Sequence, residues 1–175
     1  MSHASSSRLL LTPEQITQKV KRIAYEIYER NFDQDSLLIA GVLDRGYYLA
    51  ERICQELDHI SHFSAEKNTL SLVEVSIQKF TEQQTQVSFN VPEAAFAEQS
   101  IILVDDVLNT GRTLAYCLSP FLKQPIKKIE IAVLVNRSHI QFPVMASYTG
   151  LELATTLQEH IEVVFDNESE GVFLR

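Results

Sequence analysis

The stretch "IILVDDVLNTGRT", residues 101–113, places an apolar run directly before two adjacent carboxylates and a short loop. A continuous apolar run such as residues 101–104 is typical of a parallel strand buried on both faces. Asp105 and Asp106 then lie at the carboxyl end of that strand, where open α/β sheets bind their ligands. Two adjacent charges are costly to bury without partners. The pair therefore predicts a site that holds a cation, hydroxyl donors or water.

The residues after the carboxylates offer hydrogen-bond donors. Thr110, Gly111 and Thr113 lie where a loop enters a helix. Backbone N–H groups at a helix N-terminus bind anions, and glycine lets a phosphate approach closely. Acceptors for sugar hydroxyls beside donors for phosphate would suit ribose 5-phosphate. A solvated turn before an ordinary helix start is the alternative that the residues alone leave open.

Strand-like and helix-like segments alternate along the chain. Residues 12–31 read as a helix, with Thr12 as N-cap, Pro13 in the first turn and Gln15 completing a capping box. Further helices are expected at 47–60 and 111–123, and strands at 36–43, 69–77, 100–105, 128–136, 147–153, 160–166 and 171–175. This alternation predicts an α/β class fold with a doubly wound, mostly parallel sheet.

The domain boundaries follow from the same pattern. Residues 1–10 are expected to form a flexible tail, and residues 11–175 a single domain. The segment 78–99 is polar and weakly patterned, and such a long excursion between strands is usually disordered or a functional lid.

Composition narrows the function classes. The net charge of −8 over 175 residues argues against a surface that coats nucleic acid. The sequence has neither a run of about 20 apolar residues, which a membrane span needs, nor the apolar core of a secretory signal. We therefore expect a cytoplasmic protein without a membrane partner. Cys54 and Cys117 are expected to be reduced, buried thiols.

The stretch 101–113 resembles the phosphoribosyl diphosphate (PRPP) fingerprint of the type I phosphoribosyltransferases. The segments "RIAYEIYERN", "AGVLDRGYYLAERI", "NVPEAAFAEQSIILVDD", "IEIAVLVNRSHIQFPVMASYTG" and "IEVVFD" follow, in order, the layout of the branch of bifunctional pyrimidine-operon attenuation regulators with uracil phosphoribosyltransferase activity. The resemblance starts at about residue 11. It implies the type I phosphoribosyltransferase fold, with a flexible lid hairpin or loop at about 75–92 and a small C-terminal hood mainly over 136–175.

The resemblance also implies an activity. Members of this family transfer ribose 5-phosphate from PRPP to a nucleobase with Mg²⁺, which is bound mainly through PRPP. Uracil is the expected base, giving UMP and pyrophosphate, and a homodimer or higher homo-oligomer is the expected assembly. The alternative is a regulatory protein of the same fold that senses PRPP or a nucleoside monophosphate.

Residue roles carry over by position in the matching motifs. The expected catalytic residues are Asp105, Asp106 and Arg45. The 5′-phosphate would be bound by Asn109, Thr110, Gly111, Arg112 and Thr113, and the pyrophosphate by Leu43, Asp44, Arg45 and Gly46. The base would contact Asn136, Arg137, His160 and Ile161, and the metal side would be formed by Asp105, Asp106 and Asp166. A cis peptide bond that is not before proline is expected between Leu43 and Asp44.

Three positions near the expected site depart from the family pattern. Asn109 stands where the regulator branch has an aromatic residue and purine enzymes often have Asp; an amide cannot accept a proton as that Asp does. Asp44 stands where the regulator branch has Thr. Val75-Ser76-Ile77-Gln78 replaces a segment with an arginine near the leaving group, for which Lys79 could supply only a point charge.

The fourth departure concerns RNA. The regulators bind messenger RNA through a basic face, but the segment 141–156 lacks several of its basic residues. Arg22, Arg30, Arg137 and His139 remain. Fewer phosphate-neutralising side chains weaken nucleic-acid binding, so RNA is kept as a disfavoured partner.

Overall fold

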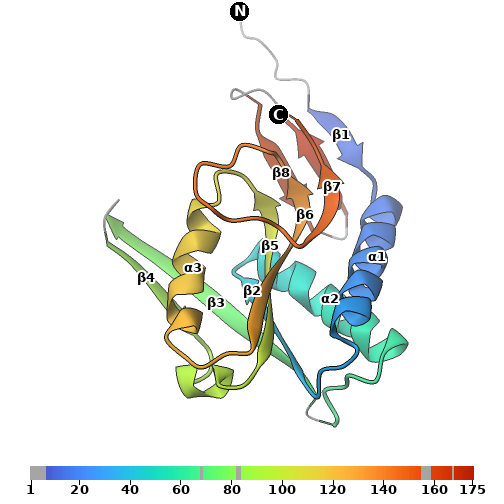
Figure 1. Cartoon of the computed structure of the whole chain (residues 1–175). Helices are drawn as coiled ribbons and strands as arrows, with labels where there is room; N and C mark the ends of the chain where they lie inside the picture. Colours follow the sequence, from blue (N-terminus) through green and yellow to red (C-terminus); the bar gives the residue numbers. More distant parts are fainter. Residues whose placement is uncertain (1–6, 68, 82–83, 155–158, 167) are drawn as a thin grey trace, which may run out of the picture.

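The computed structural model describes residues 7–67, 69–81, 84–154, 159–166 and 168–175. The strands of the described residues form two sheets (Figure 1). The six-stranded sheet has the order β4-β3-β2-β5-β6-β7, and a three-stranded sheet has the order β1-β9-β8. The larger sheet is parallel except for β4, as the alternation of elements predicts.

The elements have the following bounds. The strands of the large sheet are β2 (Leu37–Val42), β3 (Leu70–Thr81), β4 (Gln84–Phe89), β5 (Ser100–Leu108), β6 (Lys128–Asn136) and β7 (Tyr148–Glu152). The small sheet contains β1 (Arg8–Leu11), β8 (Ile161–Val164) and β9 (Gly171–Leu174). The helices are α1 (Pro13–Asn31), α2 (Arg45–Ile60) and α3 (Arg112–Leu122), with a 3-10 turn η1 (Glu93–Phe96).

The first helix begins as the capping box predicts. The backbone N–H of Gln15 donates to the Thr12 hydroxyl at 3.3 Å, and the Thr12 N–H donates to Oε1 of Gln15 at 2.9 Å. These bonds satisfy two backbone donors that the first turn would otherwise leave unpaired. The apolar stripe behind the cap is buried and comprises Ile16, Val20, Ile23, Ala24 and Ile27.

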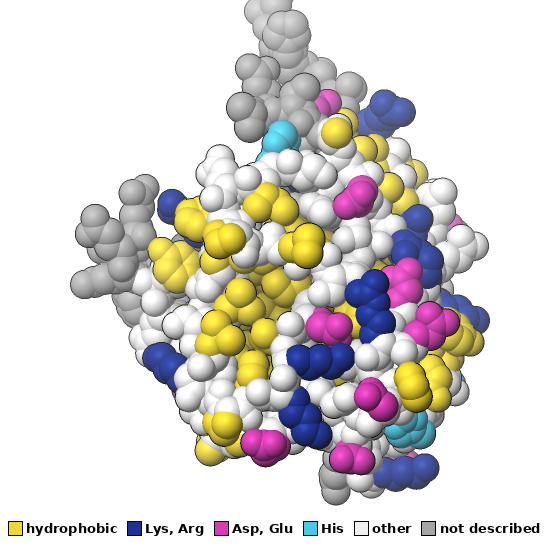
Figure 2. All heavy atoms as spheres, viewed as in Figure 1, with side chains coloured by type: hydrophobic (Ala, Val, Ile, Leu, Met, Phe, Trp, Pro, Cys, Tyr) yellow, Lys and Arg dark blue, Asp and Glu magenta, His cyan; other side chains and the backbone are white. Residues whose placement is uncertain are grey.

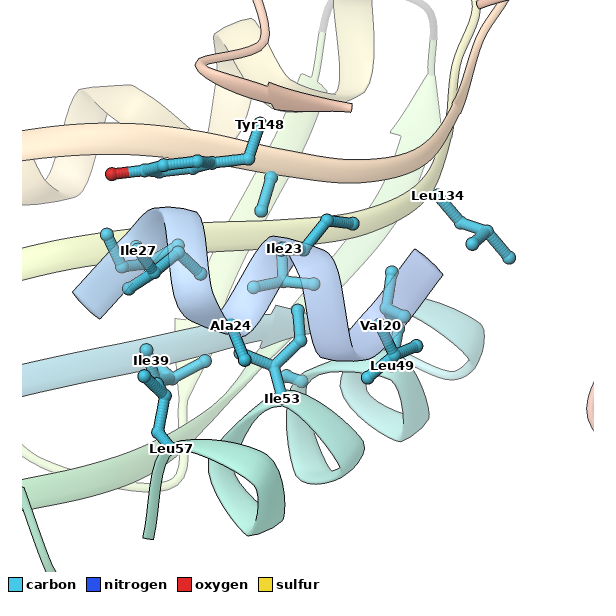
Figure 3. Close-up of a cluster of buried hydrophobic side chains, with 14 of the residues drawn as sticks. Val20, Ile23, Ala24, Ile27, Ile39, Leu49, Ile53, Leu57, Leu134 and Tyr148 are labelled. Carbon is cyan, nitrogen blue, oxygen red and sulfur yellow. The ribbon is translucent and has the colours of Figure 1, made fainter. Parts of the chain in front are cut away.

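The large sheet is covered on both faces, with α1 and α2 on one side and α3 on the other (Figure 1). Every residue of β2 is buried, because its alternate side chains enter two different clusters. Leu37 and Ile39 join the α1–α2 cluster, in which Ile39 lies near Leu57 of α2 (Figure 3). Leu38, Ala40 and Val42 join the α3 cluster. This burial fixes the central strands whose carboxyl ends carry the candidate site.

At the N-terminus, the structure differs from the expected flexible tail and adds a strand to the expected hood. The flexible-tail prediction is wrong for residues 8–10, because Arg8–Leu11 form β1 and pair with β9 in antiparallel register. Leu11 is buried there. An unpaired β9 would expose one row of backbone hydrogen-bonding groups, and β1 supplies the missing neighbour. The hood therefore takes a strand from the N-terminus besides β8 and β9.

The expected lid region is a hairpin made by the outer part of β3 and by β4. Its base rests on three aromatic rings. The Phe89 centroid lies 4.8 Å from Phe96 and 5.0 Å from Phe121 of α3, and the last two lie 4.7 Å apart. The hairpin is thus anchored to α3 at one end and extends away from the sheet at the other (Figure 1).

Two further predictions can be compared with the structure. Both cysteines are free thiols; Cys117 is buried and Cys54 half-buried. No helix in the described part of the chain has the length and apolarity needed to cross a membrane.

The hood is attached to α2 by an ion pair and by a ring stack. Arg52 pairs with Glu170, and its Nη2 donates to the Thr17 hydroxyl at 2.8 Å. The Tyr48 and Phe165 rings stack at 4.9 Å. Because Arg52 and Glu170 are each only 20% exposed, removing one partner leaves a poorly solvated charge.

We predict that Arg52→Met destabilises the fold by about 1–3 kcal/mol, since Glu170 would keep a partly buried, unpaired carboxylate. Urea unfolding followed by circular dichroism measures the change. The double variant Arg52→Met/Glu170→Gln should recover part of the loss. Equal stability of the wild type and Arg52→Met would show that the pair does not hold the hood.

Candidate functional site

A cavity of about 350 Å³ lies beyond the carboxyl ends of β2 and β5, next to β8 of the hood. Its lining residues are Val42, Leu43, Arg45, Ile77, Asp105, Asp106, Val107, Asn109, Thr113, His160 and Ile161. The structure therefore brings together residues from the expected pyrophosphate, ribose, phosphate and base groups. Val42, Ile77 and Val107 join them without having been proposed as site residues.

The two aspartates are held by the backbone that follows them. Oδ1 of Asp105 accepts from the Asp106 N–H at 2.9 Å, and Oδ1 of Asp106 accepts from the Val107 N–H at 2.9 Å. Asp105 is only 9% exposed. Burial, together with the neighbouring charge of Asp106, raises the pKa of Asp105 well above its usual value. A cation or a set of hydroxyl donors would offset the charge of this pair.

The turn before α2 brings Arg45 near the acidic pair. Nη1 of Arg45 lies 3.9 Å from Oδ2 of Asp106, and the Arg45 side chain is half exposed. The peptide bond between Leu43 and Asp44 is cis, as the resemblance implies. Asp44 is exposed and its side chain makes no cap hydrogen bond to α2. Its charge can thus remain in solvent beside an anion site.

Gly46 has a packing role that its position in the expected pyrophosphate turn does not reveal. A Cβ at this residue would lie 2.8 Å from the Val104 carbonyl oxygen and 2.9 Å from Cα of Asp105. Real Cβ atoms do not come so close to backbone. Only glycine lets the start of α2 touch the end of β5.

A second, smaller cavity of about 50 Å³ follows the acidic pair and is lined by the whole segment from Asn109 to Thr113. Gly111 has a positive φ of 84°, which glycine adopts without strain. The loop is fixed from behind, because the N–H groups of Gln141 and Phe142 both donate to the Thr110 carbonyl at 3.0 Å. The cavity lies at the N-terminus of α3, where backbone N–H groups favour an anion.

Arg112 contributes to this loop through its backbone. Its side chain is exposed, and the guanidinium lies over the Phe142 ring at 5.1 Å from the centroid. The Arg112 N–H faces the Thr110 hydroxyl at 3.4 Å. Side-chain charge from Arg112 is therefore directed to Phe142, and the expected phosphate contact falls to the backbone.

The hood presents a strand edge to the cavity. His160 and Arg175 exchange both backbone hydrogen bonds, at 2.7 and 2.8 Å. In an antiparallel pair such residues alternate with residues whose backbone groups point the other way. The N–H and C=O of Ile161 therefore point away from β9, on the open side of β8. Of the two expected hood residues, Ile161 can offer backbone groups to a base, whereas those of His160 are engaged with Arg175.

The other two expected base contacts lie outside the cavity lining. Asn136 is buried; its Nδ2 donates to Oε1 of Glu152 at 3.3 Å, and its Oδ1 accepts from the Ser138 N–H at 3.1 Å. Arg137 is also buried and lies behind Asn109. Asn136 therefore holds β6 to β7 and a turn.

The expected metal residues are not all brought together. Asp166 is exposed; its carboxylate accepts from the Glu168 N–H at 3.4 Å, and its carbonyl accepts from the Ser169 N–H at 3.0 Å. Among the described residues, no group of three or more His, Cys, Asp or Glu could hold a metal ion. The carboxylates of Asp105 and Asp106 remain. Two hard oxygen donors suit a Mg²⁺ ion that takes its other ligands from water and substrate phosphates.

The lid strand contributes an apolar side chain. Ile77 of β3 lines the cavity and is partly buried. The side chain of Lys79, the expected substitute for an arginine, lies outside the described residues. The sequence shows the substitutions in the lid segment, and the cavity lining identifies Ile77 as the described lid residue that faces the cavity.

Comparison with known proteins agrees with this geometry. Residues 9–167 match the family model of the phosphoribosyl transferase domain. The chain is 32% identical to a bifunctional protein PyrR of Staphylococcus saprophyticus, over 94% of this chain and 95% of that protein. It is 36% identical to the protein of the same name from Deinococcus radiodurans, over 93% and 89%.

Solved structures of similar fold are more distant in sequence. A hypoxanthine-guanine phosphoribosyltransferase of Bacillus anthracis gives a TM-score of 0.70 at 19% identity, covering 84% of each chain. A hypoxanthine phosphoribosyl transferase of Trypanosoma cruzi gives 0.72 at 15% identity, covering 87% of this chain and 81% of the other. Family match, curated relatives and fold agree, and the chain is therefore a member of the type I phosphoribosyltransferase family.

Proposed function

We propose that this protein transfers ribose 5-phosphate from PRPP to uracil, giving UMP and pyrophosphate. The supporting observation is that two adjoining cavities bring together an acidic pair, a small pocket at a helix N-terminus and an open strand edge of the hood. These three parts match, in order, the ribose, the 5′-phosphate and the base of a nucleoside monophosphate.

Binding follows the order of the elements. Backbone N–H groups and hydroxyls of Thr110–Thr113 hold the 5′-phosphate in the smaller cavity. Asp105 and Asp106 accept the ribose hydroxyls, directly or through the shell of Mg²⁺. The turn at Leu43–Gly46 receives the pyrophosphate, with Arg45 as its cation. Bound Mg²⁺ supplies positive charge to the leaving pyrophosphate.

The reaction exchanges one bond at C1′ for another. The C1′–O bond to pyrophosphate breaks and its electron pair leaves with the pyrophosphate, while N1 of uracil forms the new bond and its proton passes to the leaving pyrophosphate or to water. Positive charge develops on the sugar, and the fixed carboxylates of Asp105 and Asp106 lie on the ribose side to stabilise it. Positioning and exclusion of water supply the rest of the catalysis.

The hood edge suits a pyrimidine. Ile161 offers one backbone donor and one backbone acceptor on the open side of β8. The N3–H of uracil and an adjacent carbonyl oxygen form the complementary pair. Main-chain recognition of this kind fixes the base in the plane of the strand without requiring a charged side chain.

A regulatory role is the second candidate, and Ile77 is the observation that favours it. An isoleucine in the cavity wall gives no charge to the leaving group, so binding can exceed turnover. RNA recognition has less support, because Arg22, Arg30 and Arg137 are already engaged. Arg22 donates to the carbonyls of Thr149 and Gly150, Arg30 lies over the Tyr148 ring, and Arg137 is buried.

Self-association is supported by an apolar surface. Hydrophobic side chains gather over α3 and residues 140–146 (Figure 2). Leu122 is 64% exposed and Met145 80%. Exposed apolar patches of this kind mark protein–protein contacts, and we propose a homodimer.

Sedimentation equilibrium tests the proposed homodimer. A single monomeric species at micromolar concentration would contradict the proposal.

Asp106→Asn should lower kcat/KM for UMP formation by about a hundredfold or more, because it removes a charge that helps to hold the ribose and acts more strongly as the sugar becomes cationic. Conversion of labelled uracil with PRPP and Mg²⁺ measures it. Asp35→Asn, an exposed residue at the opposite end of β2, is the matched control and should leave the rate unchanged. Equal rates for both variants would remove the acidic pair from the mechanism.

Ile77→Arg is expected to raise kcat by about tenfold, since a cation in the cavity wall would stabilise the leaving pyrophosphate. Ile77→Leu preserves the apolar wall and serves as control. The same labelled-uracil assay applies, with nucleotide affinity measured in parallel. A wild-type protein that binds UMP tightly but forms none, and gains no turnover from Ile77→Arg, would support the regulatory role instead.

A further inference from the structure

The side chain of Asn109 lies at the junction of the two cavities, since it lines both of them. Its amide carries an acceptor oxygen on one side and two N–H donors on the other. Which of the two faces the ligand decides what the ligand must offer. Assignment of amide orientation rests on the neighbouring hydrogen bonds, and at Asn109 one neighbour is decisive.

That neighbour is Arg137. Its Nη1 donates to Oδ1 of Asn109 at 2.9 Å. A guanidinium has five N–H donors and no acceptor, so only the oxygen of the amide can face it. A reversed Asn109 would place N–H groups against N–H groups beside a positive charge. The orientation of the amide is therefore fixed by chemistry.

Arg137 is itself held in place. Its side chain is 8% exposed, its Nη2 donates to the Glu159 carbonyl at 2.6 Å, and its backbone N–H donates to the Leu108 carbonyl at 3.0 Å. Leu108 directly precedes Asn109, and Glu159 is two residues before Ile161. One buried cation thus connects the phosphate loop to the hood edge and keeps the Asn109 oxygen engaged.

We propose that Asn109, oriented by Arg137, selects a base with a carbonyl oxygen over one with an amino group at the edge that meets it. With Oδ1 engaged, Asn109 presents the N–H donors of Nδ2 to the cavity. The backbone of Ile161 offers both a donor and an acceptor, which uracil and cytosine can each satisfy. Asn109 offers only donors, which suit the O4 of uracil and oppose the N4 amino group of cytosine.

This inference rests on the proposed nucleotide site and deepens it by naming a specificity residue and its positioning residue. A site whose N–H donors pair with a carbonyl oxygen strongly rejects a base that carries an amino group at that position. The N–H donors of the site then face other donors and stay unpaired. The sugar and phosphate are common to UMP and CMP, so the ratio of their dissociation constants isolates the contribution of the base.

The experiment measures binding of UMP, CMP and ribose 5-phosphate by titration calorimetry to the wild type and to three variants. The wild type is expected to bind UMP about tenfold or more tightly than CMP. Asn109→Asp keeps the shape and the acceptor toward Arg137 but replaces the donors, and the UMP preference should fall about tenfold. Arg137→Met releases the amide and should lose most of the preference, whereas Arg137→Lys, which still donates, should keep it.

The three ligands separate the possible failures. Absence of binding of UMP and of ribose 5-phosphate to the folded wild type would contradict the nucleotide site itself. Tight UMP binding with an unchanged UMP-to-CMP ratio in Asn109→Asp and Arg137→Met would overturn the specificity role alone. A loss of ribose 5-phosphate affinity in Arg137→Met as large as the loss of UMP affinity would overturn it as well, by assigning Asn109 to the sugar phosphate. Circular dichroism confirms that each variant is folded.

Discussion

The contact between the start of α2 and the end of β5 determines the rest of the site. Val104 and Asp105 leave no room for a Cβ at position 46. The start of α2 and the end of β5 therefore meet backbone to backbone. The turn that would hold pyrophosphate and the carboxylates that would hold ribose are therefore parts of one rigid junction. Arg45 and Asp106 flank this contact, and Nη1 of Arg45 lies 3.9 Å from Oδ2 of Asp106.

The junction also explains why charge can gather here. Asp105 is buried beside Asp106, an arrangement that raises the pKa of Asp105 and would be unfavourable in an isolated strand. Backbone N–H groups of the next residues offset part of the cost for each carboxylate. The remainder is left for a ligand that brings hydroxyl groups or a divalent cation.

Predictions from the sequence were most accurate for features that depend on neighbouring residues and on their order along the chain. The cap at Thr12, the buried strand before Asp105 and the glycine turn at Gly111 are all local features, and each is confirmed. The chain order alone placed Asn109–Thr113 after the acidic pair, and that segment lines the smaller cavity. The cis bond at Leu43–Asp44 is present as well, although only family resemblance indicated it.

Contacts between distant segments were beyond such reasoning. The sequence pattern of Arg8–Leu11 does not indicate that this segment pairs with β9. Arg137 was expected to contact the base by family position, yet its guanidinium lies behind Asn109, because packing of the hood against β6 decides which way a buried arginine points. Asn136 likewise donates to Glu152 of β7, a contact between distant segments, whereas Asp166 accepts from Glu168 within its own turn.

The two ends of the candidate site depend on different groups: backbone groups at one end and individual side chains at the other. The proposed phosphate end would rely on backbone groups at the start of α3 and on one left-handed glycine, so a change of side chain there should leave the anion site in place. The base end and the lid rely on individual side chains such as Asn109 and Ile77, where one substitution alters the donor pattern or the charge. Of the departures from the family pattern, Asp44 and residues 75–78 lie outside the lining of the smaller cavity, whereas Asn109 is part of it. A substitution at Asn109 or Ile77 would therefore change the proposed base preference or turnover, while the backbone groups that would hold the phosphate stay the same.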